Sequence, residues 1–358
     1  RSSLCEVVGV YLKEKYNKQA WLFRIHGTRF VLVFNKPKEQ ENALNEIKER
    51  FKGQWLANGE DYKLNVLIFY FTDTYQKPHT QAFIDYVATL DKEVDSITVN
   101  GPIKITEESI AKAREKNNIL KLLQKVLQTN NGEMCMYYQP IYNIKKQQFT
   151  KAEALIRLKD PELGFIRPDV FIPIAEANGL ADKIDEFALI SACKVLRENK
   201  DIKEISINVS CTDFFENPCQ KYLDITDKYE IDPSRISFEI TETAAIKYPD
   251  KIQSFMKKMV NNKFKFYLDD YGTGYSNLAQ LIDKPFACIK IDKELLSEED
   301  KVKIVLKSSV ELFHSINLPV TIEGVETEEQ KNIYRDLGCD AIQGYFYSKP
   351  LPEDEFIT

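Results

Sequence analysis

The sequence predicts an α/β protein whose larger part is a (β/α)8 barrel of the TIM type. Eight short β-rich runs alternate with amphipathic stretches between residues 136 and 346. Acid and amide side chains occur where several of these runs end, and the strand ends of a parallel barrel meet at one mouth. A different pattern of apolar runs precedes residue 105, which indicates a second, smaller α/β domain.

Period-2 and helical patterns define the barrel elements in order. The eight predicted strands are residues 136–142, 149–158, 205–210, 236–241, 265–270, 288–293, 319–325 and 341–346. Amphipathic stretches long enough for crossover helices lie between most of them, for example 184–199, 244–262 and 301–317. This alternation of strand and helix is typical of a parallel barrel.

The N-terminal region has its own order of elements. Two apolar runs around a polar turn, residues 21–34, predict a hairpin, and the patterns that follow predict a helix at 39–51, a strand at 62–71, a helix at 81–90 and a strand at 97–99. A long helix, 107–128, joins the two regions. We therefore expect an N-terminal domain over 1–105 and a barrel domain over 106–358 that includes the connecting helix.

Composition indicates an ordinary soluble protein. The 358 residues are 43% hydrophobic and 29% charged, enough to bury full cores. The net charge of −6 gives no general attraction to phosphate backbones, so nucleic acid is not an expected partner, and a phosphate ligand needs a local site or metal ions.

The cysteines and the first residue of the chain indicate in which compartment of the cell the protein is expected. The seven cysteines are scattered and never form C-x-x-C, which disfavours disulfides or a zinc site and favours a reducing cytoplasm. No apolar run reaches the ~18 residues of a membrane span. Because the first residue is Arg1 rather than Met, we expect further sequence upstream, where a sensor or membrane anchor has room.

The candidate site consists of side chains at successive strand ends. Any one of them alone is as well explained as a helix cap or a ligand of a backbone amide. Crowded acids repel one another unless cations neutralise them, and oxygen ligands without His or Cys suit Mg²⁺ or Mn²⁺. The set is Glu153, Asn208, Glu239, Asp269, Asp270, Glu323 and Gln343.

Three further features support chemistry at phosphorus. The adjacent pair Asp269 and Asp270 could hold two ions ~4 Å apart, as in two-metal displacement, although a strand end followed by a glycine turn explains the same pair. Lys290 could hold a water or stabilise negative charge, or be a solvated surface lysine. Arg157 shares a strand face with Glu153, and its fork could bind a phosphate oxygen.

These residues resemble a known family. The segment EALIR at 153–157 is similar to the E-A-L-x-R signature of EAL-domain phosphodiesterases, which hydrolyse cyclic di-GMP to linear pGpG. The match continues in order with INVS around Asn208, FEITE at 238–242, DDYGTGYS at 269–276, KID at 290–292, EGVE at 323–326 and QGY at 343–345. It covers residues 107–358.

The resemblance implies a barrel with one antiparallel strand and two divalent ions, Mg²⁺ or Mn²⁺, at its mouth. It also implies a homodimer through the barrel. The roles it implies are metal ligands Glu153, Asn208, Glu239, Asp269 and Asp270; catalytic residues Glu323 as base, Lys290 and Gln343; substrate contacts Gln139, Leu155 and Arg157; and Glu242 as anchor of the loop 270–276. Tyr271 replaces the usual Phe and Ile322 the usual Ala, and neither change removes a ligand.

The N-terminal region resembles the second half of a GGDEF domain, the diguanylate cyclase fold. Its signature turn reads HGTRF at 26–30 and lacks the acids that a cyclase needs for Mg²⁺. The inhibitory R-x-x-D site is also absent, since residues 17–20 read NKQA, and too few residues precede the turn for a whole domain. We expect a partial, catalytically inactive domain with a regulatory or dimerising role.

Two other functions remain open from the sequence. One is a receptor that binds cyclic di-GMP without hydrolysing it, although such a receptor would typically have lost metal ligands or the base, and none is lost here. The other is hydrolysis of a different phosphodiester at the same metal pair.

Overall fold

The structure is a computed structural model that describes residues 2–24, 28–70, 102–129, 132–210, 218–247, 249–272, 283–295 and 300–357. It divides into two compact units, Arg1–Asn118 and Ile119–Thr358. The division falls inside helix α4 (Glu107–Thr129), which we had assigned wholly to the barrel domain. No helix among the described residues is long and apolar enough to cross a membrane.

The described residues of the N-terminal unit form two antiparallel hairpins and two helices, α1 and α2, around a small core that includes Tyr16 and Trp55. Its described elements are α1 (Ser2–Tyr16), β1 (Ala20–Arg24), β2 (Phe30–Phe34), α2 (Pro37–Lys52), β3 (Gln54–Ala57), β4 (Glu60–Lys63), β5 (Phe69–Tyr70) and β6 (Ile103–Lys104). The predicted hairpin at 21–34 and helix at 39–51 are confirmed.

One predicted strand in this unit is wrong. The run 62–71 divides between β4 and β5, and residues 64–68 between them belong to no strand. A turn at Asn58 and Gly59, with φ of 54° and 82°, pairs residues 60–63 with β3. Helix α1 was not predicted, although Val8, Leu12 and Tyr16 follow helical spacing. The predicted elements 81–90 and 97–99, and residues 26 and 27 of the signature turn, lie outside the described residues.

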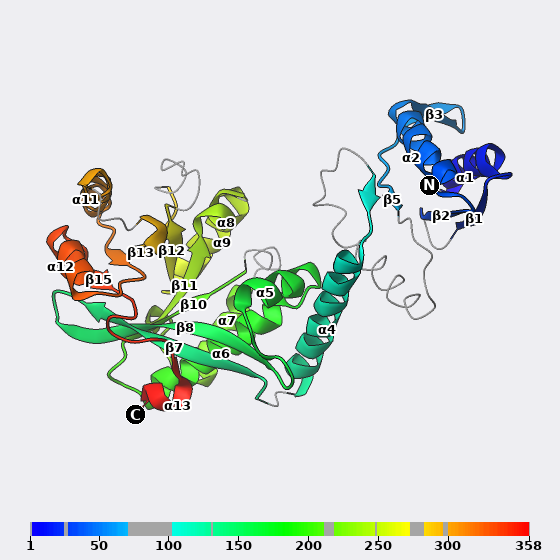
Figure 1. Ribbon diagram of the computed structural model, residues 1–358. Helices are drawn as coiled ribbons and strands as arrows, with labels where there is room; N and C mark the ends of the chain where they lie inside the picture. Colours follow the sequence, from blue (N-terminus) through cyan, green and yellow to red (C-terminus); the bar gives the residue numbers. More distant parts are fainter. Residues whose placement is uncertain are drawn as a thin grey trace. The chain divides into compact units, whose positions relative to one another are not determined.

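The second unit is a closed barrel, as predicted (Figure 1). The ring consists of β7 (Met134–Asn143), β8 (Gln148–Asp160), β10 (Glu204–Asn208), β11 (Ile236–Thr241), β12 (Lys265–Tyr271), β13 (Cys288–Ile291), β14 (Val320–Ile322) and β15 (Ala341–Ile342). Strand β7 pairs antiparallel with both β8 and β15, and the other pairs in the ring are parallel. Two short strands extend it, β9 (Gly164–Ile166) on β8 and β16 (Leu351–Pro352) on β7.

Helices follow most of the parallel strands. They are α5 (Pro168–Ala177), α6 (Ala181–Glu198), α7 (Cys219–Lys228), α8 (Glu242–Lys247), α9 (Pro249–Asn261), α11 (Asp300–Ser315), α12 (Glu328–Asp336) and α13 (Glu353–Ile357), with 3-10 turns at Pro233–Arg235 and Lys293–Leu295. The single helix predicted over 244–262 is two helices, and Pro249 begins the second because proline suits a first turn and disfavours helix in the residue before it.

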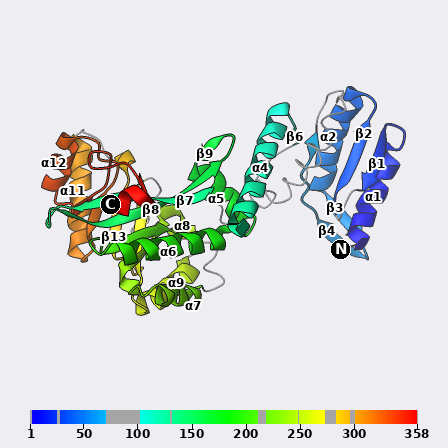
Figure 2. The ribbon, with the colours of Figure 1, turned by 90° about the horizontal axis from the view of Figure 1, so that it is seen from below.

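Alternation along the strands separates the core from the site. On β8, Ala152, Ala154 and Leu158 are buried in the hydrophobic clusters. Their neighbours Glu153, Leu155 and Arg157 therefore point to the opposite face, the inner side of the ring. Figure 2 shows the end of the β7–β8 hairpin that pairs with β9, and this end lies beside α4 and α5. Charged residues in these strands thus face one another rather than the helices.

Candidate active site

Lys290 lies at the centre of four carboxylates. Its ammonium Nζ is 2.8 Å from Glu239 Oε2, 3.0 Å from Asp269 Oδ1, 2.7 Å from Glu323 Oε1 and 3.3 Å from Glu153 Oε2. The lysine is 1% exposed, because β13 is buried at every position and directs it into the ring. The possibility of a solvated surface lysine is therefore wrong.

Amide side chains complete the inner layer. Gln343 donates from Nε2 to Glu153 Oε2 at 2.6 Å and to Gln139 Oε1 at 3.1 Å. Asn208 donates from Nδ2 to the other oxygen of Glu153 at 2.8 Å. Gln139 faces Glu153 directly in the pairing of β7 with β8 and donates to the carbonyl oxygen of Ser348 at 3.0 Å. The carboxylate of Glu153 is thus held in place by side chains on three strands or strand ends.

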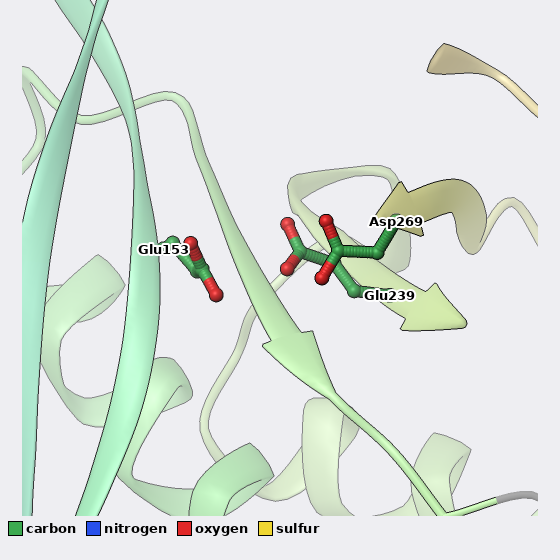
Figure 3. A group of neighbouring side chains, drawn as sticks. All are labelled: Glu153, Glu239 and Asp269. Carbon is green, nitrogen blue, oxygen red and sulfur yellow. The ribbon is translucent and has the colours of Figure 1, made fainter. Parts of the chain in front are cut away.

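The carboxylates form two overlapping groups that fit divalent cations. Within the described residues, oxygen atoms of Glu153, Glu239 and Asp269 lie within 4.8 Å of one another, and so do those of Asp269, Asp270 and Glu323. Figure 3 shows the first group, with the carboxylates of Glu239 and Asp269 facing Glu153. Asp269 belongs to both groups, which is the arrangement expected of a bridging ligand.

A buried oxygen without a partner supports the same fit. Glu239 is 1% exposed, and its Oε1 has no hydrogen-bond partner among the described residues. Burying a carboxylate oxygen without a hydrogen bond costs free energy, and a bound divalent cation would remove that cost. Sites made only of oxygen ligands suit such cations. The residues present therefore fit Mg²⁺ or Mn²⁺ better than Zn²⁺.

Burial and crowding shift the acid equilibria of the site. Burial, followed by the charge of Glu153, raises the pKa of Glu239 well above its usual value. Burial also raises the pKa of Asp270 to about 6 and that of Glu323 to about 8. At Glu153 burial acts in the same direction, but Lys290 and the amide donors outweigh it and lower the pKa. One ammonium does not balance this many carboxylates, so additional positive charge would stabilise the ionised site.

A cavity of ≈ 310 Å³ opens onto these groups. Of the predicted site residues, the structure brings together at its wall Gln139, Glu153, Leu155, Asp269, Asp270, Glu323 and Gln343. Asn208 contacts Glu153 of this set, Lys290 contacts Asp269, and Glu239 lies beside Glu153 and Asp269. Arg157 does not line this cavity; it lines an adjoining one and lies over the ring of Tyr137, 5.4 Å from its centroid.

Further residues line the cavity that sequence reasoning gave no role. They are Asp292, Lys293, Gly324, Glu326, Gly344 and Tyr345. Each follows β13, β14 or β15 in the structure, and all except Glu326 lie in the last residues of the predicted strands 288–293, 319–325 and 341–346. The strand-end rule that found the carboxylates could therefore have included them. Asp292 also contributes to the raised pKa of Asp270.

Two contacts explain local sequence around the site. Glu242, at 1% exposure, accepts a hydrogen bond from the Gly272 N–H at 3.1 Å and so ties the start of α8 to the turn after β12. At Gly344 a Cβ atom would lie 2.1 Å from the carbonyl oxygen of Val325. Only glycine fits there, and this close approach ends the predicted strand 341–346 after Ile342. Residues 273–276 of the predicted loop lie outside the described residues.

Known proteins are similar in sequence to this chain over most of its length. The oxygen sensor protein DosP of Escherichia coli is 29% identical over 366 residues, covering 99% of this chain and 45% of DosP. The cyclic di-GMP phosphodiesterase PdeL of E. coli is 32% identical over 243 residues, covering 65% of this chain and 66% of PdeL. The chain spans less than half the length of DosP and 29% of the signaling protein YkoW of Bacillus subtilis.

Solved structures agree with the barrel topology. The phosphodiesterase PaMucR in its c-di-GMP complex is 28% identical, with a TM-score of 0.62, over 67% of this chain and 99% of that one. The family model for the EAL domain matches residues 121–350. The family predicted from the sequence motifs is thereby confirmed: the chain belongs to the EAL domain family.

Proposed function

We propose that this protein is a phosphodiesterase that hydrolyses cyclic di-GMP to linear pGpG with two divalent ions, Mg²⁺ or Mn²⁺. The observation that carries the proposal is the pair of carboxylate groups sharing Asp269 beside a buried lysine at the barrel mouth. Its relatives PdeL and MucR are named for cyclic di-GMP phosphodiesterase activity, which supports the same substrate.

In this proposal the residues divide between holding ions and moving protons. Glu153, Asn208, Glu239 and Asp269 hold one ion, and Asp269, Asp270 and Glu323 hold the other. Bound ions would lower the pKa of a water and offset charge on the phosphate oxygens. Glu323 accepts the proton of the attacking water, Lys290 stabilises the negative charge that develops beside it, and Gln343 fixes the orientation of Glu153 through the 2.6 Å hydrogen bond.

The test is direct. Purified protein is incubated with cyclic di-GMP and Mg²⁺ or Mn²⁺, and products are separated by chromatography, with EDTA as the control. Linear pGpG that forms only with metal supports the proposal. Binding of cyclic di-GMP without pGpG would favour a receptor, and turnover of a different cyclic dinucleotide alone would favour another substrate.

For the rest of the protein we propose a regulatory role. The N-terminal unit would be an inactive remnant of a GGDEF domain, which the loss of acids in the HGTRF turn supports. A homodimer through the barrel is also proposed. Measuring nucleotide cyclisation by the chain, and its mass in solution by light scattering, tests the two ideas separately.

A further inference from the structure

The inner side of the ring holds a second group of charged and polar side chains, outside the candidate active site. It consists of Lys151 on β8, Glu204 on β10, and Lys265 and Tyr267 on β12, which we call the basal cluster. Glu204 is 4% exposed and Tyr267 is 3% exposed. Branched apolar side chains usually fill the interior of a parallel barrel, so a buried ion-pair network there requires an explanation.

The basal cluster lies directly below the proposed metal ligands. Lys151 precedes Glu153 by two residues on β8, and Tyr267 precedes Asp269 by two residues on β12. Because alternate residues of a strand point to the same side, each of these pairs shares the inner face of the ring, about 7 Å apart along the strand. Both strands run toward the barrel mouth, so the cluster forms the layer beneath the carboxylates.

The hydroxyl of Tyr267 joins β12 to β8 and β10. It donates a hydrogen bond to Glu204 Oε1 and accepts one from Lys151 Nζ. The other oxygen of Glu204, Oε2, accepts a hydrogen bond from Lys265 Nζ at 2.5 Å. Burial opposes ionisation of Glu204, but Lys151 and Lys265 outweigh it and lower the pKa of this carboxyl. The cluster is therefore an ionised network in which Tyr267 is the link between strands.

These contacts span four consecutive strands of the ring, β8, β10, β11 and β12. Lys151 and Glu204 are direct partners in the pairing of β8 with β10. On β11 the residue paired with Lys265 is Ser237, whose small side chain lets Glu204 reach across that strand to Tyr267. The same four strands carry the proposed ligands of the first ion, which are Glu153, Asn208, Glu239 and Asp269.

Stability alone is a weak explanation for the basal cluster. Taking charges out of water costs free energy that their mutual attraction offsets only in part, and apolar side chains of similar size often stabilise a core equally well. A fully bonded buried network can instead specify one arrangement of the elements that it joins. In this ring, that arrangement is the relative position of the strands that carry the metal ligands.

We propose that Tyr267 is a positioning residue for the first metal ion: its hydroxyl links Lys151 and Glu204 and thereby fixes the spacing of the strands that carry the ligands. The proposal rests on the proposed function, which supplies the ion. Tyr267 touches neither the ion nor the substrate and acts through the positions of Glu153 and Asp269. Loss of the hydroxyl therefore weakens metal binding more than it weakens the fold.

The experiment measures Mn²⁺ binding by calorimetry on the full chain, for wild type and for Tyr267→Phe, which removes the hydroxyl and keeps the ring. Tyr138→Phe is the matched control, because Tyr138 is also buried and donates to a carboxylate, Glu353 Oε2 at 3.3 Å, but packs in the hydrophobic core. A triple variant, Lys151→Met with Glu204→Met and Tyr267→Phe, replaces the network by apolar side chains. Thermal unfolding in EDTA gives Tm for each protein, and pGpG formation along a metal titration gives kcat and the KM for cyclic di-GMP.

We expect Tyr267→Phe to raise the Kd for Mn²⁺ roughly three- to tenfold, less than the loss typical of a group bonded directly to a metal ligand. Its Tm in EDTA should fall little, its KM for cyclic di-GMP should stay near the wild-type value, and saturating metal should restore most of kcat. The triple variant should raise the Kd for Mn²⁺ by at least about tenfold, while its Tm in EDTA equals or exceeds that of wild type. Tyr138→Phe should keep the wild-type Kd.

An unchanged Kd for Mn²⁺ in folded Tyr267→Phe overturns the proposal, whether or not its Tm falls, because a purely structural cluster would change Tm alone. An equal loss of metal affinity in Tyr138→Phe also overturns it. Failure of the proposed function has a different signature. If wild type binds Mn²⁺ but forms no pGpG, the hydrolytic activity is removed, and the Kd of Tyr267→Phe still decides the role of this residue. A wild-type protein that binds no Mn²⁺ overturns both.

Discussion

Replacing Lys290 by methionine tests the electrostatics of the barrel mouth. The change removes a buried ammonium that lies within 3.3 Å of four carboxylates while keeping a chain of similar length. The variant should be less stable than wild type in EDTA, because the acids lose their shared cation. Divalent ions should then stabilise the variant more than wild type, because the net charge of its carboxylate site is more negative by one.

The size of the effect follows from the contacts. Each contact near 3 Å is an attraction of about 5 kcal/mol at an effective dielectric constant of 20 before desolvation is subtracted. Removing one partner from a buried ion pair typically costs about 3–5 kcal/mol. A barrel unit of this size loses roughly 2–4 °C in Tm per kcal/mol, so we expect a fall of roughly 6–20 °C in EDTA. If the variant binds the metal tenfold more tightly than wild type, saturating metal would restore about 1.4 kcal/mol of its free energy of unfolding.

The assay is thermal unfolding in EDTA and along an Mg²⁺ titration. Lys151→Met is the matched control: it removes one ion pair, to Glu204, whose carboxylate keeps Lys265 at 2.5 Å. That control should lose less stability and should show no added dependence on Mg²⁺. Equal Tm values for Lys290→Met and wild type in EDTA, or equal gains with Mg²⁺, would refute the reasoning.

Four other substitutions test the site, with pGpG formation and Tm as the readouts. Asp269→Ala should abolish turnover and weaken calorimetric Mn²⁺ binding, since both carboxylate groups share this residue; full activity would contradict the assignment. Gly344→Ala should lower stability by about 1–3 kcal/mol, because the added methyl meets backbone, and an unchanged Tm would show that the close approach is wrong. Glu242→Ala should lower kcat with a small change in Tm, through loss of its hydrogen bond to the Gly272 N–H. At saturating metal, Lys290→Ala should lower kcat by at least ~10²-fold while substrate binding persists.

The barrel was predictable because strand patterns and strand-end chemistry agree. Each parallel strand is a short apolar run, and the side chains named from the sequence do converge, from Glu153 on β8 to Gln343 after β15. The family motifs added the antiparallel first strand, which periodicity alone does not reveal.

The errors arose where one residue's backbone geometry decides the structure. The hairpin turn at Asn58 and Gly59 pairs residues 60–63 with β3, so the run predicted over 62–71 is not one strand. The predicted strand 341–346 ends after Ile342, and the close approach of Gly344 to the backbone of Val325 is set by another segment of the chain. The direction of Arg157 was also out of reach, since its neighbour Tyr137 is known only once the register of β7 on β8 is fixed.

The closing strand β7 has a consequence for synthesis on the ribosome. It pairs with β8 within a few residues of sequence but reaches β15 only at Ala341 and Ile342, which are translated much later. Until those residues emerge, β7 and β14 present open edges that invite pairing with other chains. A nonsense mutation shortly before residue 341 would therefore leave an aggregation-prone open sheet that lacks Gln343.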